Sequence, residues 1–340
     1  MFCALIFYTI TLTLVLFMAY TLPLLAFISC YFFILIALKF NIFSTISDIP
    51  NHRSLHSIPT PRSGGIFIMM SIFPAWAILN IDEFSPIIYS ALIIFIISLI
   101  DDVSNISPIY RIIMQTISGA CFIYLTNFDY MTIQLILLVI IIVYSSNMFN
   151  FMDGADGLAS GYAFIGFGFY GVNSIINGNT YFGLFNFSIS LACLAFLFFN
   201  YQPAKIFMGD SGSVTLGFLA SVIGIYGWNI SVWEYYYPFL VFSFFLLDST
   251  YTLILRLANR KNIFSAHKEH IYQKAIACGF SHKKTMMCYL ISAFIVNFLI
   301  LFLVYIDSSE RLVHLLLLAV IMYFFITARI VNKKFNIKGR

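Results

Sequence analysis

Residues 147–159 read NMFNFMDGADGLA, and this polar stretch interrupts a chain that otherwise consists largely of apolar runs. Amides, carboxylates and glycines alternate within it. Polar groups are costly inside a lipid bilayer, so a cluster this dense must face water at a helix end or line an enclosed polar site. We therefore interpret the stretch as the centre of an active site.

The composition indicates an integral membrane protein. Hydrophobic residues make up 61% and charged residues 9% of the 340-residue chain, whereas about a quarter of a soluble domain is charged. Apolar runs of about 15 to 20 residues recur between short polar breaks, as in membrane-spanning helices. The alternating polarity of a membrane β-barrel is absent. The sequence therefore predicts an all-α, polytopic membrane protein.

The hydropathy pattern predicts 11 or 12 spans within one membrane domain, residues 1–340. The predicted spans are 2–19, 23–40, 65–80, 87–101, 109–126, 131–149, 157–176, 181–199, 214–230, 236–256, 285–305 and 312–330. Residues 1–22 form an extra helix if the chain breaks at Thr21–Pro23, and a start at Met18 leaves 11 spans. No cleavage-site pattern follows the first run, so we expect an anchor and not a removed signal peptide.

Threading these spans through a bilayer places every polar loop of interest on one side. Of the 18 Lys and Arg residues only Arg311 lies on the other side, so the positive-inside rule makes the first side cytoplasmic. The net charge of +4 gives no support for binding nucleic acid. The six cysteines are scattered without a CxxC pair, and we expect neither disulfides nor zinc among them.

The loop between the second and third runs suits a phosphate. It contains Arg53, His56 and Arg62 before a Gly-Gly step into the next helix. A proline-stiffened loop that carries only positive-inside charge is the alternative.

Adjacent carboxylates close a later span. Asp101 and Asp102 repel each other at a membrane surface unless a cation or a basic group compensates, so they suggest a metal or a phosphate-handling base. A solvated helix end is the simpler alternative.

In the central stretch, polar residues recur at spacings of three, namely Asn147, Asn150, Asp153 and Asp156. If the stretch is helical, each is a surface neighbour of the next. Oxygen ligands of this kind suit Mg²⁺ or Mn²⁺. Gly154 and Gly157 let the backbone unwind and approach a ligand.

The motif Gly209–Ser213 precedes the span that begins at Val214. A small-residue turn before a helix N-terminus presents free N–H groups to an anion, and Asp210 can hold a metal that bridges that anion. Helix capping by Ser211 or Ser213 is the structural alternative.

The last polar loop is basic and contains His267 and His270. The order is not HExxH and no third ligand is apparent, so recognition of a phosphate or lipid headgroup is favoured over zinc. Asp248, inside a predicted span, needs a partner, which is either Arg256 or a residue of the loop.

Together these motifs, in this order, resemble the polyprenyl-phosphate N-acetylhexosamine-1-phosphate transferases. The resemblance covers residues 48 to about 282. It implies transfer of a sugar 1-phosphate from a UDP-HexNAc to undecaprenyl phosphate, with release of UMP, at the cytoplasmic face of a bacterial inner membrane. It also implies Mg²⁺ as cofactor, with Mn²⁺ as an alternative, and a role in starting O-antigen or another envelope polysaccharide.

The resemblance implies residue roles as well. Asp101 and Asp102 are the catalytic candidates, and Asn150 and Asp210 the metal ligands. The substrate-binding candidates are Asn147, Asp153, Gly154, Asp156, Gly157, Lys205, Ser211, His267, His270, Arg53, His56 and Arg62.

Several alternatives stay open at the level of sequence. His270-Ile-Tyr-Gln departs from the His-x-His-His run of GlcNAc-1-phosphate transferases and resembles a branch that uses other N-acetylated sugars. Asp101 orients the lipid phosphate, or forms a covalent aspartyl intermediate. A multi-helix transporter is the main alternative function, with a di-aspartyl protease behind it. The oligomeric state is undetermined, with a homodimer among the alternatives.

Overall fold

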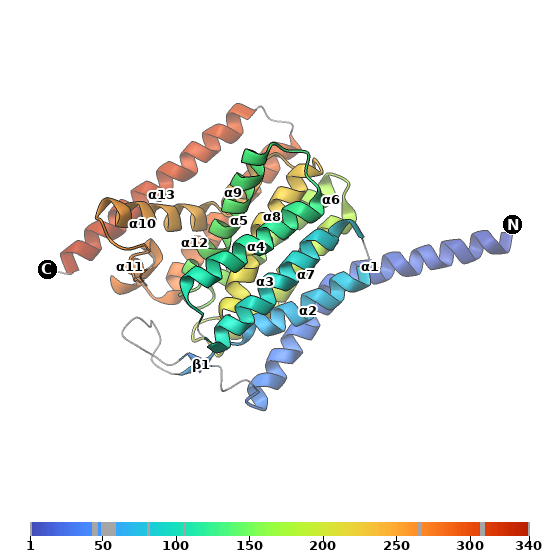
Figure 1. Cartoon of the computed structure of the whole chain (residues 1–340), viewed down its shortest axis with the longest axis horizontal. Helices are drawn as coiled ribbons and strands as arrows, with labels where there is room; N and C mark the ends of the chain where they lie inside the picture. Colours follow the sequence, from blue (N-terminus) through green and yellow to red (C-terminus); the bar gives the residue numbers. More distant parts are fainter. Residues whose placement is uncertain are drawn as a thin grey trace.

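The structure is a computed structural model, and it is a bundle of helices with the connecting loops gathered towards its ends (Figure 1). It describes residues 2–42, 47–48, 59–79, 82–104, 106–263, 265, 267–306 and 310–338. The elements are α1 (Phe2–Lys39), β1 (Ser47–Asp48), β2 (Thr60–Pro61), α2 (Gly64–Leu79), η1 (Asp82–Phe84), α3 (Ser85–Ser104), α4 (Pro108–Thr126), α5 (Thr132–Met152), α6 (Leu158–Ile176), α7 (Thr180–Asn200), α8 (Asp210–Asn229), α9 (Tyr237–Val241), α10 (Ser243–Ala258), α11 (Ile271–Ala277), α12 (His282–Tyr305) and α13 (Glu310–Lys338). The all-α prediction is confirmed, apart from a two-residue antiparallel ribbon of β1 and β2.

The predicted break at Thr21–Pro23 is wrong. α1 continues through Pro23, so the first two predicted spans form one helix and residues 1–22 are not a separate one. Proline is tolerated within membrane helices, where neighbouring groups satisfy the backbone carbonyl that the ring leaves unpaired. The other ten predicted spans each coincide with a helix, except that residues 236–256 divide into α9 and α10 at Phe242.

Among the described residues, eight helices are long and apolar enough to cross a membrane. This number is below the predicted 11 or 12 because α2 has 16 residues and α9 and α10 are short. The glycines, tyrosines and Asn173 of α6 lower its hydropathy. The chain is a multi-pass helical membrane protein.

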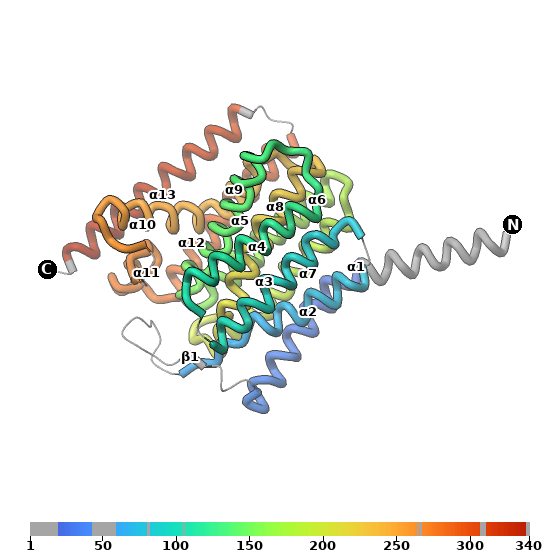
Figure 2. The backbone as a smooth tube through the Cα atoms, in the orientation of Figure 1, coloured from blue at the N-terminus to red at the C-terminus, as the bar shows by residue number. Residues whose placement is uncertain are grey.

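The central helix of the bundle is α8. In its apolar stretch 94% of the residues are buried, against 22% in α12 and in α13. Small residues let neighbouring helices come close, and the Ser145 hydroxyl of α5 donates to the Gly217 carbonyl at 2.7 Å. The trace shows α13 along the edge of the bundle, near α10 and α11 (Figure 2). The site is therefore built around the end of the most deeply buried helix.

Backbone hydrogen bonds join loops that are distant in sequence at this end. Phe207 N–H donates to the Pro61 carbonyl at 2.7 Å, and Gly64 N–H donates to the Phe207 carbonyl at 2.9 Å. The ribbon of β1 and β2 is thereby attached to the segment that leads into α8. This agrees with the prediction that the polar loops of interest lie on one side of the membrane.

Candidate active site

Asp102 caps the N-terminus of the central helix α8. Its Oδ1 accepts the N–H of Asp210 at 2.8 Å and its Oδ2 accepts the N–H of Ser211 at 2.9 Å. The first N–H groups of a helix have no partner within the helix, and a carboxylate there also meets the positive end of the helix dipole. Asp102, predicted to be catalytic, therefore holds the end of α3 against the start of α8.

Arg111, at the first turn of α4, joins two of the predicted site carboxylates. Its Nε lies 3.1 Å from Asp101 Oδ2, and its Nη2 lies 2.9 Å from Asp210 Oδ2. Asn150 reaches the same cluster from α5, because its Nδ2 donates to Asp210 Oδ1 at 2.8 Å. Three helices and the N-terminus of a fourth thus meet at one polar centre.

Arg111 was not among the residues singled out from the sequence. The available signal was its position, since it is the only Lys or Arg in the predicted span 109–126. A basic side chain within an apolar run calls for a nearby acidic partner.

The predicted phosphate-binding loop is represented in the described residues by Arg62. Its Nη2 donates to the backbone carbonyl of Asp102 at 2.7 Å, so Arg62 ties the loop to the end of α3. Arg53 and His56 lie outside the described residues.

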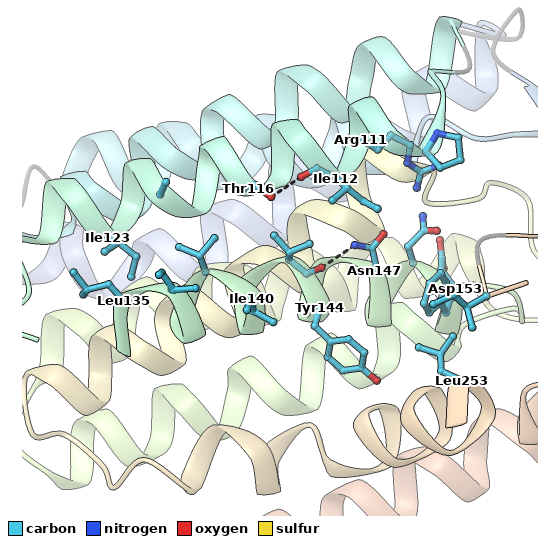
Figure 3. Close-up of a pocket in the computed structure, with 18 of the residues that line it drawn as sticks. Arg111, Ile112, Thr116, Ile123, Leu135, Ile140, Tyr144, Asn147, Asp153 and Leu253 are labelled. Atoms are coloured by element: carbon cyan, nitrogen blue, oxygen red, sulfur yellow. Dashed lines mark hydrogen bonds between the residues drawn. The ribbon is translucent and has the colours of Figure 1, made fainter. Parts of the chain in front are cut away.

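A cavity of about 1270 Å³ extends from the polar centre along α4 and α5. Figure 3 shows Arg111, Asn147 and Asp153 at one end, and Ile140, Leu135 and Ile123 further along it. We call this cavity the α4–α5 groove. Its lining residues include Pro108, Ile112, Thr116, Ala120, Ile136, Val139, Val143, Tyr144, Phe151 and Leu253. The groove therefore runs without interruption from a polar end at Arg111 to an apolar length along α4 and α5.

Six predicted site residues line the polar end of this groove, namely Asn147, Asn150, Asp153, Gly154, His267 and His270. The predicted helical spacing holds only in part, because α5 ends at Met152. Asn147 and Asn150 lie one turn apart on α5, and the Asn147 amide donates to Gln115 Oε1 of α4 at 2.6 Å. Asp153 follows as the C-cap residue.

The environment of Asp153 favours its protonated form. Burial raises the pKa of its carboxyl well above the usual value, and the negative charges of Asp210 and Asp102 raise it further. Asp153 is half-buried and lines the groove, where a bound molecule can contact it.

The two glycines of the central stretch have different structural roles. A Cβ on Gly154 would lie 2.2 Å from the Tyr272 hydroxyl, so only glycine permits this close packing of α11. Gly157 has φ of 73° as it starts α6, and its N–H donates to Asn200 Oδ1 at 3.0 Å. Gly157 is therefore a turn residue that does not line the groove.

Asp156 lies in a second cluster beside the first. Its Oδ1 lies 3.4 Å from His282 Nδ1, and its Oδ2 accepts the N–H of Ala204 at 3.2 Å. These contacts tie the loop after α5 to the start of α12. Asp156 does not line the α4–α5 groove.

Two more candidates also lie away from the groove. The side chain of Lys205 is exposed on the loop before α8. The hydroxyl of Ser211 is buried without a hydrogen-bond partner among the described residues, while its N–H is held by Asp102. Neither lines the α4–α5 groove.

The basic loop folds into a short helix, α11, which the sequence did not predict. His267 and His270 stack with ring centroids 5.0 Å apart beside the groove. Burial, then the charges of His270 and Arg256, lower the pKa of His267 to about 4, so its ring is neutral near pH 7. Glu269 holds the loop through Arg256 Nη1 at 2.8 Å and Lys261 Nζ at 3.0 Å.

Asp248 is paired with the loop and not with Arg256. Its Oδ1 accepts the N–H of Ile271 at 2.8 Å, whereas Arg256 binds Glu269. Of the two partners considered from the sequence, the loop is correct.

The predicted metal site has oxygen ligands of the right type. Within the described residues no three His, Cys, Asp or Glu side chains gather as a metal-binding group. Asp101, Asp210 and the Asn150 amide do converge, and the Arg111 guanidinium already compensates both carboxylates. Mg²⁺ usually takes one or two carboxylates and completes its shell with water and substrate phosphates. The carboxylate and amide groups that converge here are of the types that Mg²⁺ prefers.

Fold and site together define a multi-pass helical membrane protein in which a carboxylate–arginine centre adjoins an apolar groove along α4 and α5. Residues 84–228 match the model of glycosyl transferase family 4. These residues include Asp101, Asp102, the central stretch and Asp210.

The relatives agree with this match. The chain is 28% identical to the probable undecaprenyl-phosphate N-acetylglucosaminyl 1-phosphate transferase of Bacillus subtilis (strain 168), over 73% of this chain and 74% of that protein. It is 44% identical to the phospho-N-acetylmuramoyl-pentapeptide-transferase of Staphylococcus aureus (strain bovine RF122 / ET3-1), over 26% of this chain and 28% of that protein. The family model and both relatives support a likeness to glycosyl transferase family 4.

Proposed function

We propose that this protein transfers a HexNAc 1-phosphate from a UDP-HexNAc to undecaprenyl phosphate. The products are undecaprenyl-diphospho-HexNAc and UMP. A phosphate oxygen of the lipid forms a bond to the β-phosphorus of the nucleotide sugar. The bond from that phosphorus to the oxygen shared with the α-phosphate breaks, and this oxygen leaves with UMP. We place the site at the cytoplasmic face of a bacterial inner membrane, where it starts O-antigen or another envelope polysaccharide.

The observation that carries this proposal is the α4–α5 groove, whose apolar length ends at Arg111 and Asn150, the residues that contact Asp210. A polyprenyl phosphate has the same division into an apolar chain and an anionic head. The chain would pack along Ile123, Leu135 and Ile140 in place of lipid tails, and because the bilayer is as apolar as the groove, this packing selects the shape of the lipid. The names of the relatives in Bacillus subtilis and Staphylococcus aureus support the same class of reaction.

In this proposal the side chains of the protein mainly bind and orient the charged phosphates of the two substrates. Arg111 moves from the two carboxylates to a substrate phosphate, for which its planar donors are suited. Asp101 orients the lipid phosphate. Both of its oxygens already have partners, because Oδ1 accepts the N–H of Ile106 at 2.6 Å and Oδ2 binds Arg111. A phosphate monoester has a second pKa of about 6 and needs no strong base at neutral pH. Both points favour direct attack by the lipid over a covalent aspartyl intermediate.

Mg²⁺ would be held by Asp210, Asp101 and the amide oxygen of Asn150, and it would neutralise charge on the diphosphate. The amide of Asn150 now donates to Asp210, so its oxygen becomes a ligand only after the amide turns. Asn147, Asp153 and the α11 residues lie where the nucleotide sugar would meet the lipid head.

The test is an assay of the purified full-length protein with undecaprenyl phosphate, Mg²⁺ and a panel of UDP-HexNAc donors. We expect UMP and a lipid-linked sugar diphosphate in equal amounts with at least one donor, and the preferred donor identifies the sugar. Release of UMP without a lipid-linked product would overturn the proposal, as would transfer of the sugar without its phosphate.

A further inference from the structure

Asp248 is a carboxylate in α10 with no exposed surface and four hydrogen-bond donors around it. Its Oδ1 accepts the N–H of Ile271 at 2.8 Å and the hydroxyl of Thr252 at 3.3 Å. Its Oδ2 accepts the N–H of Tyr272 at 3.2 Å and the hydroxyl of Tyr289 at 2.5 Å. Only an ionised carboxylate can accept from all of these donors at once.

The two N–H groups belong to the first turn of α11. This helix has seven residues, and a helix that short is not stable in water without tertiary contacts. Asp248 therefore supplies a cap from a different helix and attaches α11 to the core. The ring nitrogen Nδ1 of His270, the residue before α11, lies 3.5 Å from Asp248 Oδ1.

From this capped turn, Tyr272 extends to the end of α5. Its hydroxyl donates to the Phe151 carbonyl at 2.9 Å and lies against the α-carbon of Gly154. His270, Tyr272 and Gln273 all line the polar end of the α4–α5 groove. The position of α11 thus determines the shape of that end.

The far side of α11 is held separately. Lys274 Nζ donates to Asn332 Oδ1 of α13 at 2.8 Å, and Asn332 Nδ2 donates to the Tyr251 hydroxyl at 3.2 Å. Loss of the Asp248 contacts would therefore loosen the groove side of α11 while this second attachment remains.

We propose that Asp248 is a positioning residue: by capping α11 it sets His270 and Tyr272 against the end of α5 and so shapes the wall of the groove's polar end. Its effect on turnover rests on the proposed function, whereas its effect on α11 does not. Asp248 itself does not line the groove.

The test compares the full-length wild type with Asp248→Asn by amide hydrogen exchange, without substrates. Whichever way the asparagine turns, its NH₂ group opposes one of the two capping N–H groups. We expect the amides of residues 271–277 to exchange about 10-fold faster or more, while those of α8 and α12 are unchanged. Thr252→Val, which removes only the 3.3 Å hydroxyl contact, is the matched control and should change exchange in α11 less than about 3-fold.

Unchanged exchange in α11 would overturn the proposal. Faster exchange throughout α8 and α12 would also overturn it, because Asp248 would then stabilise the whole bundle and not α11. Asp248→Glu and Asp248→Gln form a second pair of variants, because the two new side chains are equal in size. The glutamate keeps both acceptor oxygens, so it should protect α11 better than the glutamine does, and equal exchange in the two variants would contradict a capping role.

Enzyme kinetics complete the test. In Asp248→Asn the KM for the nucleotide sugar should rise by about 5-fold or more while the KM for the lipid changes little, since α11 lines only the polar end. A fall in kcat alone, with both KM values unchanged, would speak against positioning. If the wild type transfers no sugar phosphate, the proposed function fails, and the exchange data still decide the role of Asp248.

Discussion

Arg111 Nη2 lies 2.9 Å from Asp210 Oδ2, so a cation from the start of α4 is paired with an anion from the start of α8. The same guanidinium also reaches Asp101 at 3.1 Å through Nε. The fork of an arginine can serve both carboxylates at once, which the single ammonium of a lysine does less well. This arrangement makes Arg111 the residue whose replacement is most informative.

We expect Arg111→Lys to reduce kcat/KM on the order of 10²-fold and Arg111→Ala to reduce it further, because a preorganised charge at the phosphate is lost. The measurement is the rate of lipid-linked product formation in matched detergent. Arg329 on α13, far along the chain from this cluster, provides the control, and Arg329→Lys should behave as wild type. Full activity in Arg111→Ala would show that Arg111 is not required for the reaction.

Asp210→Asn should abolish activity while the protein still folds. The backbone N–H of residue 210 that binds Asp102 is retained, but one carboxylate charge is lost from the predicted metal site. The measurement is turnover across a Mg²⁺ titration, together with the melting temperature. Turnover equal to wild type at limiting Mg²⁺ would exclude Asp210 as a ligand.

Replacing Asp101 and replacing Asp102 should have different effects on stability, although both residues are predicted to be catalytic. Asp102→Asn leaves one of the two α8 N–H groups facing an NH₂ group, so we expect unfolding to become easier by about 1–3 kcal/mol, together with a loss of activity. Asp101→Asn should lower activity with a smaller change in stability, because Asp101 holds the local turn at Ile106 and shares Arg111 with Asp210, which remains as a partner of that guanidinium. Thermal unfolding and turnover of the two variants check this, and identical behaviour would argue against the division.

A bulky residue in the groove should weaken binding of the lipid substrate and leave binding of the nucleotide sugar unchanged. Ala120 lines the α4–α5 groove, and Ala120→Trp should raise the KM for undecaprenyl phosphate about 10-fold, because the indole would occupy space that the lipid chain needs. The KM for the nucleotide sugar should not change. Ile117 lies on the same helix, is 49% exposed and does not line the groove, so Ile117→Trp is the matched control. Equal effects of the two variants would place the lipid elsewhere.

His267 should make stability depend on pH in a defined window. Its pKa is lowered to about 4 from a usual 6.5, so between these values the unfolded chain binds a proton that the folded protein does not. This contribution to stability is present above pH 6.5 and is lost as the pH falls towards 4. As the pH is lowered from 6.5 to 4, the melting temperature of wild type should therefore fall relative to that of His267→Gln. A difference between the two that is constant from pH 4 to 7.5 would contradict the prediction.

The sequence alone determined the helices and the clustering of the loops. Both follow from local properties, since an apolar run long enough to cross a bilayer must satisfy its backbone groups within itself, and polar loops are excluded from lipid. Ten of the predicted spans coincide with helices, and Arg62, Asp102, Asn150 and Asp210 meet as the threading required. The exception at Pro23 has the same origin, because proline is a weaker break in a membrane helix than in a soluble one.

Only the tertiary structure decided which polar groups pair. Asp248 had two plausible partners in sequence, and its choice of α11 over Arg256 depends on how α10, α11 and α12 pack. Arg111 joins Asp101 to Asp210, residues more than a hundred positions apart, and Asp156 turns from the groove towards His282. Such pairings depend on which helix ends come together in space, and hydropathy and spacing within one segment carry no information about that.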